Sequence, residues 1–302
     1  MNPSSLRRAL ALSVLLASTA CALIATQACS SDSSSSTPSA DSGTSTPDAS
    51  SAADASPSPD GASAIRAKYV LVHGAFQGQW SWSDVAAGLT ARGATVKTLD
   101  LPAHGDDMTS PTAVSLDLYV SAINAAIDAV GPPVVLVGHS MGGIPITQTA
   151  EKYPTKIQKL VYLGAYLPKN GDSLQALAMM DPDSHLGPNL TVDLDAGVGK
   201  LPMDKLKDIF CADCNDAQTA NLLAHYRDEP LASLVATVST TDANWGSVSK
   251  YYIHTLADHA VTYKLQQTMV SGITLTKETS LNTSHCPFLS VPSQVVDALG
   301  AL

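Results

Sequence analysis

The sequence feature that most constrains the fold is the run over residues 134–142, in which an apolar strand leads directly into Gly-x-Ser-x-Gly. Residues 134–137 are continuously apolar and mostly β-branched, as in a strand buried on both faces of a parallel sheet. Gly138 and Gly142 leave room for a sharp turn around Ser140, and a helical pattern follows. An ordinary Gly-rich turn or a phosphate-binding loop is the alternative. The strand and helix on either side favour a nucleophile elbow that exposes the Ser140 hydroxyl above the sheet.

Composition bounds the class of protein. The 302 residues are 45% hydrophobic and 15% charged, which is enough for one large α/β domain with a sizeable core. The net charge of −10 arises from 17 basic and 27 acidic residues. This acidic balance argues against a nucleic-acid partner, which a basic patch would indicate, and against electrostatic attraction to anionic lipid.

The N-terminal 64 residues are predicted to lie outside the folded domain. Residues 1–28 read as a signal peptide, because Arg7 and Arg8 precede an apolar run with small residues near its end. Cys29 and the Ser-rich tether after it resemble a bacterial lipoprotein signal with a lipidated cysteine; Cys21 is a second candidate, and a single-span anchor is the alternative. Residues 29–64 are low in complexity and form a predicted disordered linker. We therefore expect a secreted or envelope-anchored protein whose membrane contact is limited to that lipid.

Residues 65–302 alternate predicted strands and helices, which indicates βαβ units and a mainly parallel sheet flanked by helices. The predicted strands cover residues 68–72, 94–101, 134–137, 157–163, 250–255 and 273–277. The alternation stops over about residues 167–248, where short apolar helices are separated by Pro, Gly and Asp. We interpret this segment as a small helical cap over Ser140, with a plain packing subdomain as the alternative.

Two cysteines of the cap, Cys211 and Cys214, form a Cys-x-x-Cys pair. A small disulfide is the favoured interpretation in an exported protein. No thioredoxin-like unit surrounds the pair, and no second ligand pair has zinc spacing, so a redox or metal site is not predicted.

A serine nucleophile needs a histidine base and a carboxylate that orients this base. In the predicted fold these follow in the chain order Ser, acid, His, and Ser140, Asp258 and His285 fit that order. Asp258 and His285 each follow the end of a predicted strand, so all three residues converge on one edge of the sheet. Asp172, after the strand that follows the elbow, is the rival acid.

The other histidines are weighed against His285. His259 adjoins Asp258 and is poorly placed to reach both partners, and the side chain of His139 is expected to point away from that of Ser140. His73 and His104 end strands on the same edge and either line the pocket or, more simply, support the structure. Surface or packing roles are expected for His185, His225 and His254.

The oxyanion of an acyl-transfer reaction needs two preorganised donors. The elbow offers the Met141 N–H, and the loop after the first predicted strand offers the Ala75 N–H, with Phe76 as the runner-up. A mere tight turn is the alternative. Gly74 and Phe76 are expected to line the substrate pocket, since a side chain at position 74 would crowd the acyl oxygen.

The chain resembles the α/β-hydrolase superfamily, in particular the plant methylesterases and hydroxynitrile lyases and their bacterial esterase relatives. The resemblance rests on residues 71–75 with Trp80 and Trp82, residues 138–143, residues 245–255, residues 258–261 and residues 284–288. It implies an α/β-hydrolase fold and a cofactor-free acyl-enzyme mechanism on a small-molecule ester, without a metal. It also supports Asp258 as the acid.

Two departures guide the choice within this superfamily. The lyases that resemble this chain carry lysine directly after the catalytic histidine and threonine at the position of Gly74, whereas this chain has Cys286 and glycine. A serine esterase for small to medium apolar carboxylic esters is therefore expected. A cyanohydrin lyase and a non-catalytic ligand binder are the alternatives.

Overall fold

The computed structural model describes residues 64–302. The predicted signal peptide and linker, with Cys21 and Cys29, lie outside the described residues. Within residues 64–302, no helix is long and apolar enough to cross a membrane.

A parallel sheet of six strands forms the centre of this domain, in the order β2-β1-β3-β4-β8-β9. The strands are β1 (Lys68–Val72), β2 (Thr95–Thr98), β3 (Val134–His139), β4 (Ile157–Leu163), β8 (Lys250–Thr255) and β9 (Lys277–Leu281). All six residues of β3 are buried, which explains its continuous apolar sequence. The α/β class and the parallel sheet predicted from the sequence are confirmed.

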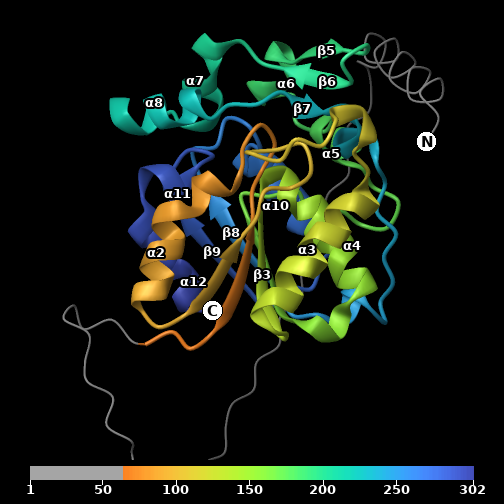
Figure 1. Ribbon diagram of the computed structural model, residues 1–302, viewed down its shortest axis with the longest axis vertical. Coiled ribbons are helices and arrows are strands. Elements are labelled where there is room, and N and C mark those ends of the chain that lie inside the picture. Colours follow the sequence, from red (N-terminus) through yellow and green to blue (C-terminus); the bar gives the residue numbers. More distant parts are fainter. Residues whose placement is uncertain (1–63) are drawn as a thin grey trace, which may run out of the picture. The chain divides into compact units, whose positions relative to one another are not determined.

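Helices cover both faces of the sheet (Figure 1). The helices α2 and α12 pack on each other on one side, and α3 and α4 on the other. These helices are α2 (Ser83–Ala91), α3 (Leu116–Val130), α4 (Gly143–Lys152), α10 (Tyr263–Val270), α11 (Pro287–Ser290) and α12 (Pro292–Gly300). Ser115 fixes the start of α3, because its side chain accepts the backbone N–H of Leu118.

The segment predicted as the cap holds short elements above the carboxyl ends of the strands (Figure 1). Its helices are α5 (Leu174–Ala178), α6 (Leu186–Asn189), α7 (Leu206–Phe210), α8 (Asp216–Ala224) and α9 (Leu231–Val235). It also contains a three-stranded antiparallel sheet of β5 (Thr191–Asp193), β6 (Val198–Lys200) and β7 (Glu229–Pro230). The sequence pattern predicts only helices here, because strands of two or three residues are too short to show an alternating pattern.

The last strand differs from its prediction. The sequence pattern predicts it at residues 273–277, but β9 covers Lys277–Leu281, with Lys277 opposite Tyr251. Apolar Ile273 and Leu275 suggested the earlier position. As the edge strand, β9 exposes most of its side chains and therefore carries a polar sequence.

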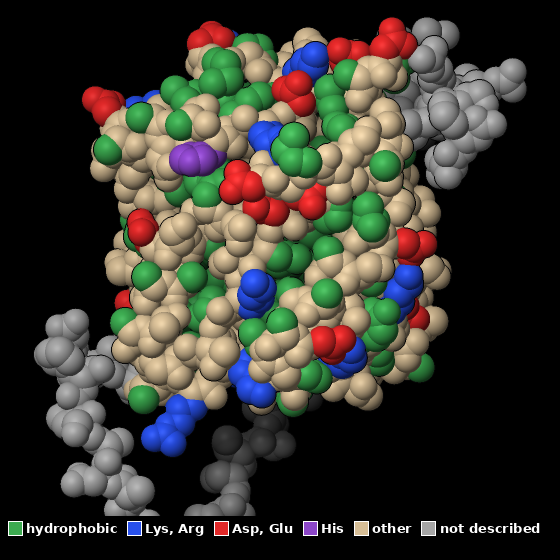
Figure 2. Space-filling model, viewed as in Figure 1, with side chains coloured by type: hydrophobic (Ala, Val, Ile, Leu, Met, Phe, Trp, Pro, Cys, Tyr) green, Lys and Arg blue, Asp and Glu red, His purple; other side chains and the backbone are tan. Residues whose placement is uncertain are grey.

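Charged side chains are spread over the surface. On the face drawn in Figure 2, Lys and Arg side chains occur singly or in small groups among acidic ones. This face therefore offers no broad positive surface.

Candidate active site

Ser140 stands at the sharp turn between β3 and α4, in the 3₁₀ turn Ser140–Gly142. Its φ angle is +53°, in the left-handed region that residues other than glycine rarely adopt. The turn is tight enough that a Cβ on Gly138 would lie 2.7 Å from the carbonyl oxygen of Gly142. The N–H of Tyr166 donates to the Ser140 carbonyl at 3.0 Å and fixes the turn to the segment after β4. This is the strained backbone that a nucleophile elbow requires.

Asp258 and His285 lie in the loops that follow β8 and β9, and their side chains meet. The Nδ1 atom of His285 donates to Oδ2 of Asp258 at 2.7 Å, and both side chains are buried. A carboxylate can only accept, so Nδ1 carries the imidazole proton and Nε2 holds the free lone pair. This is the tautomer that a general base for a serine hydroxyl needs.

The carboxylate of Asp258 is held from several directions. Its Oδ1 atom accepts the backbone N–H groups of Ala260 and Val261, each at 2.8 Å. Its Oδ2 atom accepts the Thr255 hydroxyl at 2.7 Å as well as the His285 imidazole. With the Gln266 amide, which donates to Oδ2 at 3.4 Å, five donors on one buried carboxylate fix its orientation toward His285.

The elbow and the His285 loop are joined through His139. The rings of His139 and His285 lie 4.5 Å apart between centroids, and His139 Nε2 donates to the His285 carbonyl at 2.8 Å. Burial, with the neighbouring His285, holds the pKa of His139 well below its usual value, so the ring is a neutral donor. Ser140 follows His139 directly, which brings it into the neighbourhood of His285.

The Nε2 atom of His285 is buried and has no hydrogen-bond partner in the described part of the chain. It is therefore not hydrogen-bonded to the Ser140 hydroxyl. Such bonds between nucleophile and base often tighten only in the substrate complex. The lone pair of His285 Nε2 therefore lies beside the elbow and accepts no other hydrogen bond from the described residues.

The loop after β1 lies against the elbow. A Cβ on Gly74 would be 2.8 Å from Ser140 Cβ, so glycine is needed for this approach. The N–H of Phe76, the runner-up oxyanion donor, already donates to Glu229 Oε2 at 2.9 Å. The N–H of Ala75 makes no hydrogen bond with any described residue. Of the two, Ala75 is the one whose N–H remains available to an oxyanion.

Aromatic side chains of the cap pack against the same loops. Phe76 stacks on Tyr226 with ring centroids 5.6 Å apart and lies 5.8 Å from Phe210. Phe210, the last residue of α7, is also 5.7 Å from the His285 ring. Phe76, expected at the pocket, therefore belongs to an apolar ring cluster next to the base.

A buried ion pair lies behind the loop after β1, and only one of its two residues was singled out from the sequence. The Nε2 atom of His104 donates to Glu229 Oε2 at 2.8 Å, and both side chains are fully buried. Burial disfavours charge on each, but their mutual attraction outweighs it, so the pKa of His104 is raised and that of Glu229 lowered. Ser233 Oγ donates to the second Glu229 oxygen at 2.6 Å. His104 thus has a structural role, whereas no motif pointed to Glu229.

His73 is a neutral part of the same region. Burial and the neighbouring His104 lower its pKa to about 3. Its Nε2 accepts the N–H of Leu101 at 3.0 Å, while Nδ1 lies 2.8 Å from the carbonyl of Gly74 and donates to it. His73 thereby supports the loop after β1, in agreement with the structural role expected for it.

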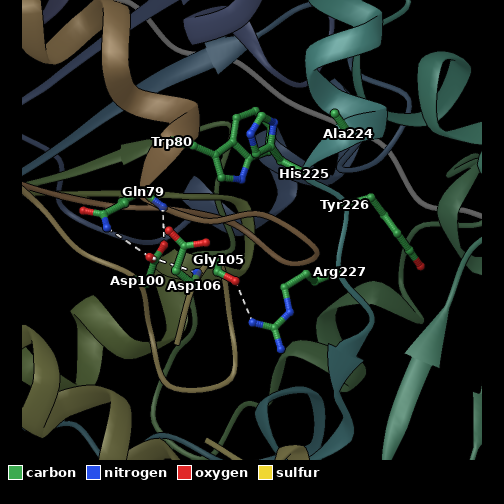
Figure 3. Close-up of a pocket in the computed structure, with 9 residues that line it drawn as sticks. All are labelled: Gln79, Trp80, Asp100, Gly105, Asp106, Ala224, His225, Tyr226 and Arg227. Carbon is green, nitrogen blue, oxygen red and sulfur yellow. Dashed lines mark hydrogen bonds between the residues drawn. The ribbon is translucent and has the colours of Figure 1, made fainter. Parts of the chain in front are cut away.

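A cavity of about 270 Å³ opens between the core loops and the end of α8 (Figure 3). Trp80 stacks on His225 at one wall, with ring centroids 4.9 Å apart, and the Arg227 guanidinium donates to the Gly105 carbonyl at 2.6 Å. None of Ser140, Asp258 and His285 lines this cavity. It marks the junction of cap and core rather than the candidate active site.

The rival assignments can be placed as well. Asp172 accepts the backbone N–H of Lys169 at 2.9 Å in a local turn and makes no bond to His285. Cys211 and Cys214 form a disulfide, the interpretation that the sequence favoured, and so are not free to bind zinc. Cys286 is a buried thiol that accepts the Gln77 amide at 3.1 Å, and burial raises its pKa well above the usual value.

Curated relatives of the chain carry esterase names. It is 33% identical over 202 residues to the carbendazim hydrolyzing esterase of Nocardioides sp. strain SG-4G. The matched region covers 64% of this chain and 80% of that esterase. It is 28% identical over 247 residues to methylesterase 9 of Arabidopsis thaliana, covering 76% and 96%. Two chloroplastic Arabidopsis thaliana proteins that are numbered among the methylesterases, 11 and 15, are 31% and 29% identical to this chain. The chain spans only 60% and 54% of their length.

Solved structures share the fold. Polyneuridine aldehyde esterase superposes with a TM-score of 0.69 at 22% identity, covering 78% of this chain and 98% of that one. A pyrethroid hydrolase gives a TM-score of 0.69 at 21% identity, covering 78% and 96%. The model of the alpha/beta hydrolase family matches residues 69–298, nearly the whole described domain. The chain therefore belongs to the alpha/beta hydrolase family, as its motifs predicted.

Proposed function

We propose that this chain is a serine esterase that cleaves small to medium apolar carboxylic esters through an acyl-enzyme. The observation that carries the proposal is the hydrogen bond between His285 Nδ1 and Asp258, which leaves Nε2 as a base beside the elbow serine. The esterase names of the relatives support the same reaction class.

The reaction begins when Ser140 Oγ attacks the ester carbonyl carbon and passes its proton to His285 Nε2. The negative charge on the carbonyl oxygen is stabilised by the N–H groups of Ala75 and Met141. Asp258 stabilises the imidazolium that forms. The carbon–oxygen bond to the alcohol then breaks, and His285 returns the proton to the leaving oxygen, so that the alcohol departs and the acyl group remains on Ser140.

Water completes the cycle. It attacks the acyl carbon while His285 Nε2 accepts one of its protons, and the second tetrahedral intermediate uses the same two backbone donors. Collapse of this intermediate releases the carboxylic acid, and the proton returns from His285 to Ser140 Oγ. No redox step or cofactor enters this balance of atoms.

The nature of the substrate is inferred from the rings near His285. Phe76, Phe210 and Tyr226 offer an apolar surface, which favours an apolar acyl or alcohol group. Cys286, a thiol whose raised pKa keeps it neutral, stands where the related cyanohydrin lyases carry a lysine. It supplies no positive charge for cyanide, so ester hydrolysis is favoured over a lyase reaction.

Kinetics with p-nitrophenyl esters of increasing acyl length test the proposal. Ser140→Ala, His285→Ala and Asp258→Asn should each lower kcat by roughly three orders of magnitude or more. Asp172→Asn is the matched control for the acid and should retain activity. If Asp172→Asn proved much more damaging than Asp258→Asn, the acid assignment would be wrong.

Covalent labelling separates an esterase from a binding protein with the same pocket. A fluorophosphonate should label the wild type and Ser247→Ala, an exposed serine used as the control, but not Ser140→Ala. Release of cyanide from mandelonitrile in place of ester hydrolysis would favour the lyase. If neither labelling nor turnover were observed, the result would favour the non-catalytic ligand binder over both enzymes.

We also propose that the chain is exported and anchored by lipid on Cys29. Arg7, Arg8 and the following apolar run support export, and the disulfide of the cap agrees with an oxidising compartment. Cys29→Ser should move the protein from the membrane fraction to the soluble fraction, while Cys21→Ser should not. The reverse result would assign the lipid to Cys21.

A further inference from the structure

Three side chains with metal-binding atoms meet on the surface where the cap contacts the loop after β8. His185 precedes α6, Asp208 lies within α7, and His259 directly follows Asp258. Their donor atoms all lie within 4.8 Å of one another. The Nδ1 atom of His185 is 2.8 Å from Asp208 Oδ2, and that of His259 is 3.4 Å from Asp208 Oδ1. His185 is hydrogen-bonded to this carboxylate, whereas His259 Nδ1 donates to the backbone carbonyl of Asp208 at 3.0 Å and has the carboxylate beside it.

The backbone around these side chains is fixed independently of them. The N–H of His185 donates to the His259 carbonyl at 2.8 Å. Four residues before His185, the Asp181 carboxylate accepts both the N–H and the hydroxyl of Thr262, at 2.8 and 2.6 Å. The cap segment and the loop after Asp258 are therefore held together, so that binding a cation would require little rearrangement of the main chain.

The donor set has a defined chemical preference. Zn²⁺ and other late divalent metals of the first transition row are commonly bound by two imidazole nitrogens and one carboxylate oxygen, with a remaining position for water. Mg²⁺ and Ca²⁺ prefer sites built from oxygen alone. Both imidazole side chains are partly exposed, at 45% and 36%, so a cation can reach them from solvent.

We propose that His185, Asp208 and His259 bind one late transition-metal dication, such as Zn²⁺, through His185 Nδ1, His259 Nδ1 and the Asp208 carboxylate. The ion replaces the hydrogen bond from His185 Nδ1 to the Asp208 carboxylate and the one from His259 Nδ1 to the Asp208 backbone carbonyl. It joins two segments of the cap to the residue that follows the proposed catalytic acid. Binding to the folded chain stabilises it against unfolding, by mass action.

Zinc binding to the purified full chain, stripped with EDTA, tests the site. Reductant is left out so that Cys211 and Cys214, which lie near Asp213 in a second group of metal-type side chains, stay in their disulfide. Competition against a chromophoric chelator should show one Zn²⁺ per chain, and excess Zn²⁺ should raise Tm by several degrees. Mg²⁺ and Ca²⁺ should have no such effect.

Three variants make the test specific. His185→Asn and Asp208→Asn should each weaken Zn²⁺ binding by at least about tenfold and abolish the Tm shift. His225→Asn removes an exposed histidine outside the cluster and should leave both unchanged. Circular dichroism and the Tm without metal establish that each variant is folded, and two independent ligand variants guard against failure of one.

Equal Zn²⁺ affinity in wild type, His185→Asn and Asp208→Asn would overturn the proposal, as would the absence of saturable binding in the wild type. An equal Tm rise with Mg²⁺ would do the same, because it would indicate a general ionic effect. Binding and Tm are measured without substrate, so the outcome does not depend on whether the chain is an esterase.

Discussion

His104 and Glu229, 125 positions apart in the sequence, form a fully buried pair at 2.8 Å directly behind the loop after β1. The same Glu229 oxygen accepts the N–H of Phe76 at 2.9 Å. Phe76 has a φ of +64°, a conformation that needs support from its surroundings. Glu229 begins the cap strand β7, so one carboxylate joins the cap, the core histidine and the loop that carries Ala75.

Removal of Glu229 should damage both stability and catalysis. Glu229→Ala leaves a buried histidine and a backbone N–H without a partner, and we expect a loss of about 3–5 kcal/mol in the free energy of unfolding. We expect Glu229→Gln, which keeps an acceptor oxygen, to cost less. In Glu229→Ala the Phe76 N–H loses its acceptor, and the loop that carries Ala75 loses this support. We therefore expect kcat to fall while KM changes little. Urea unfolding and ester kinetics measure the two effects.

Glu278→Gln is the matched control for that prediction. Glu278 pairs with His254 at 3.1 Å, but its side chain is 51% exposed. We expect a cost below about 1 kcal/mol and unchanged kcat. Equal effects of Glu229→Ala and Glu278→Gln would show that burial of the His104 pair contributes nothing.

The stabilisation by the His104–Glu229 pair should depend on pH. The raised pKa of His104 means that its contribution is complete below the ordinary histidine value of 6.5 and is lost as the pH rises through the raised pKa. The lowered pKa of Glu229 means that its contribution is present above the ordinary value of 4.5 and is lost as the pH falls through the lowered pKa. The difference in unfolding free energy between wild type and Glu229→Gln should therefore be largest between pH 4.5 and 6.5. A difference that is constant from pH 4 to pH 9 would contradict the ionised pair.

Substitution of Gly74 should obstruct the nucleophile. In Gly74→Ala the new Cβ would lie 2.8 Å from both Ser140 Cβ and His139 Nδ1, and both neighbours are buried. We expect a destabilisation of about 1–3 kcal/mol and a marked fall in kcat. Gly187→Ala, where nothing lies within 4 Å of the added Cβ, serves as the control and should be neutral or slightly stabilising. Wild-type turnover in Gly74→Ala would show that the loop after β1 can move away from the elbow.

The ring of Phe210 should limit the size of the substrate. Phe210→Leu opens space beside His285 and Phe76, so the ratio of kcat/KM for long over short p-nitrophenyl esters should rise. Leu222→Ala, in the same cap but in α8, removes a buried side chain that is not part of the ring cluster at His285, and should leave that ratio unchanged. An unchanged ratio in Phe210→Leu would place the acyl group elsewhere.

Much of the fold could be predicted because its signals are local. The buried run of β3, the glycines around Ser140 and the alternation of strands and helices each depend on neighbouring residues, and the structure has them where they were expected. The edge strand β9 was misplaced by four residues because its exposed side chains are polar, so apolar residues just before it attracted the prediction. The short strands of the cap left no periodic signal at all.

The sequence by itself determined the fold class, the elbow and the order in which Ser140, Asp258 and His285 follow one another, since chain order and turn chemistry are properties of local sequence. The tertiary structure alone decided which distant groups meet. It paired His104 with Glu229, placed His139 against His285, and gathered His185, Asp208 and His259 on one surface. These contacts join residues up to 146 positions apart, and they arise from burial and packing, which no pattern of neighbouring residues encodes.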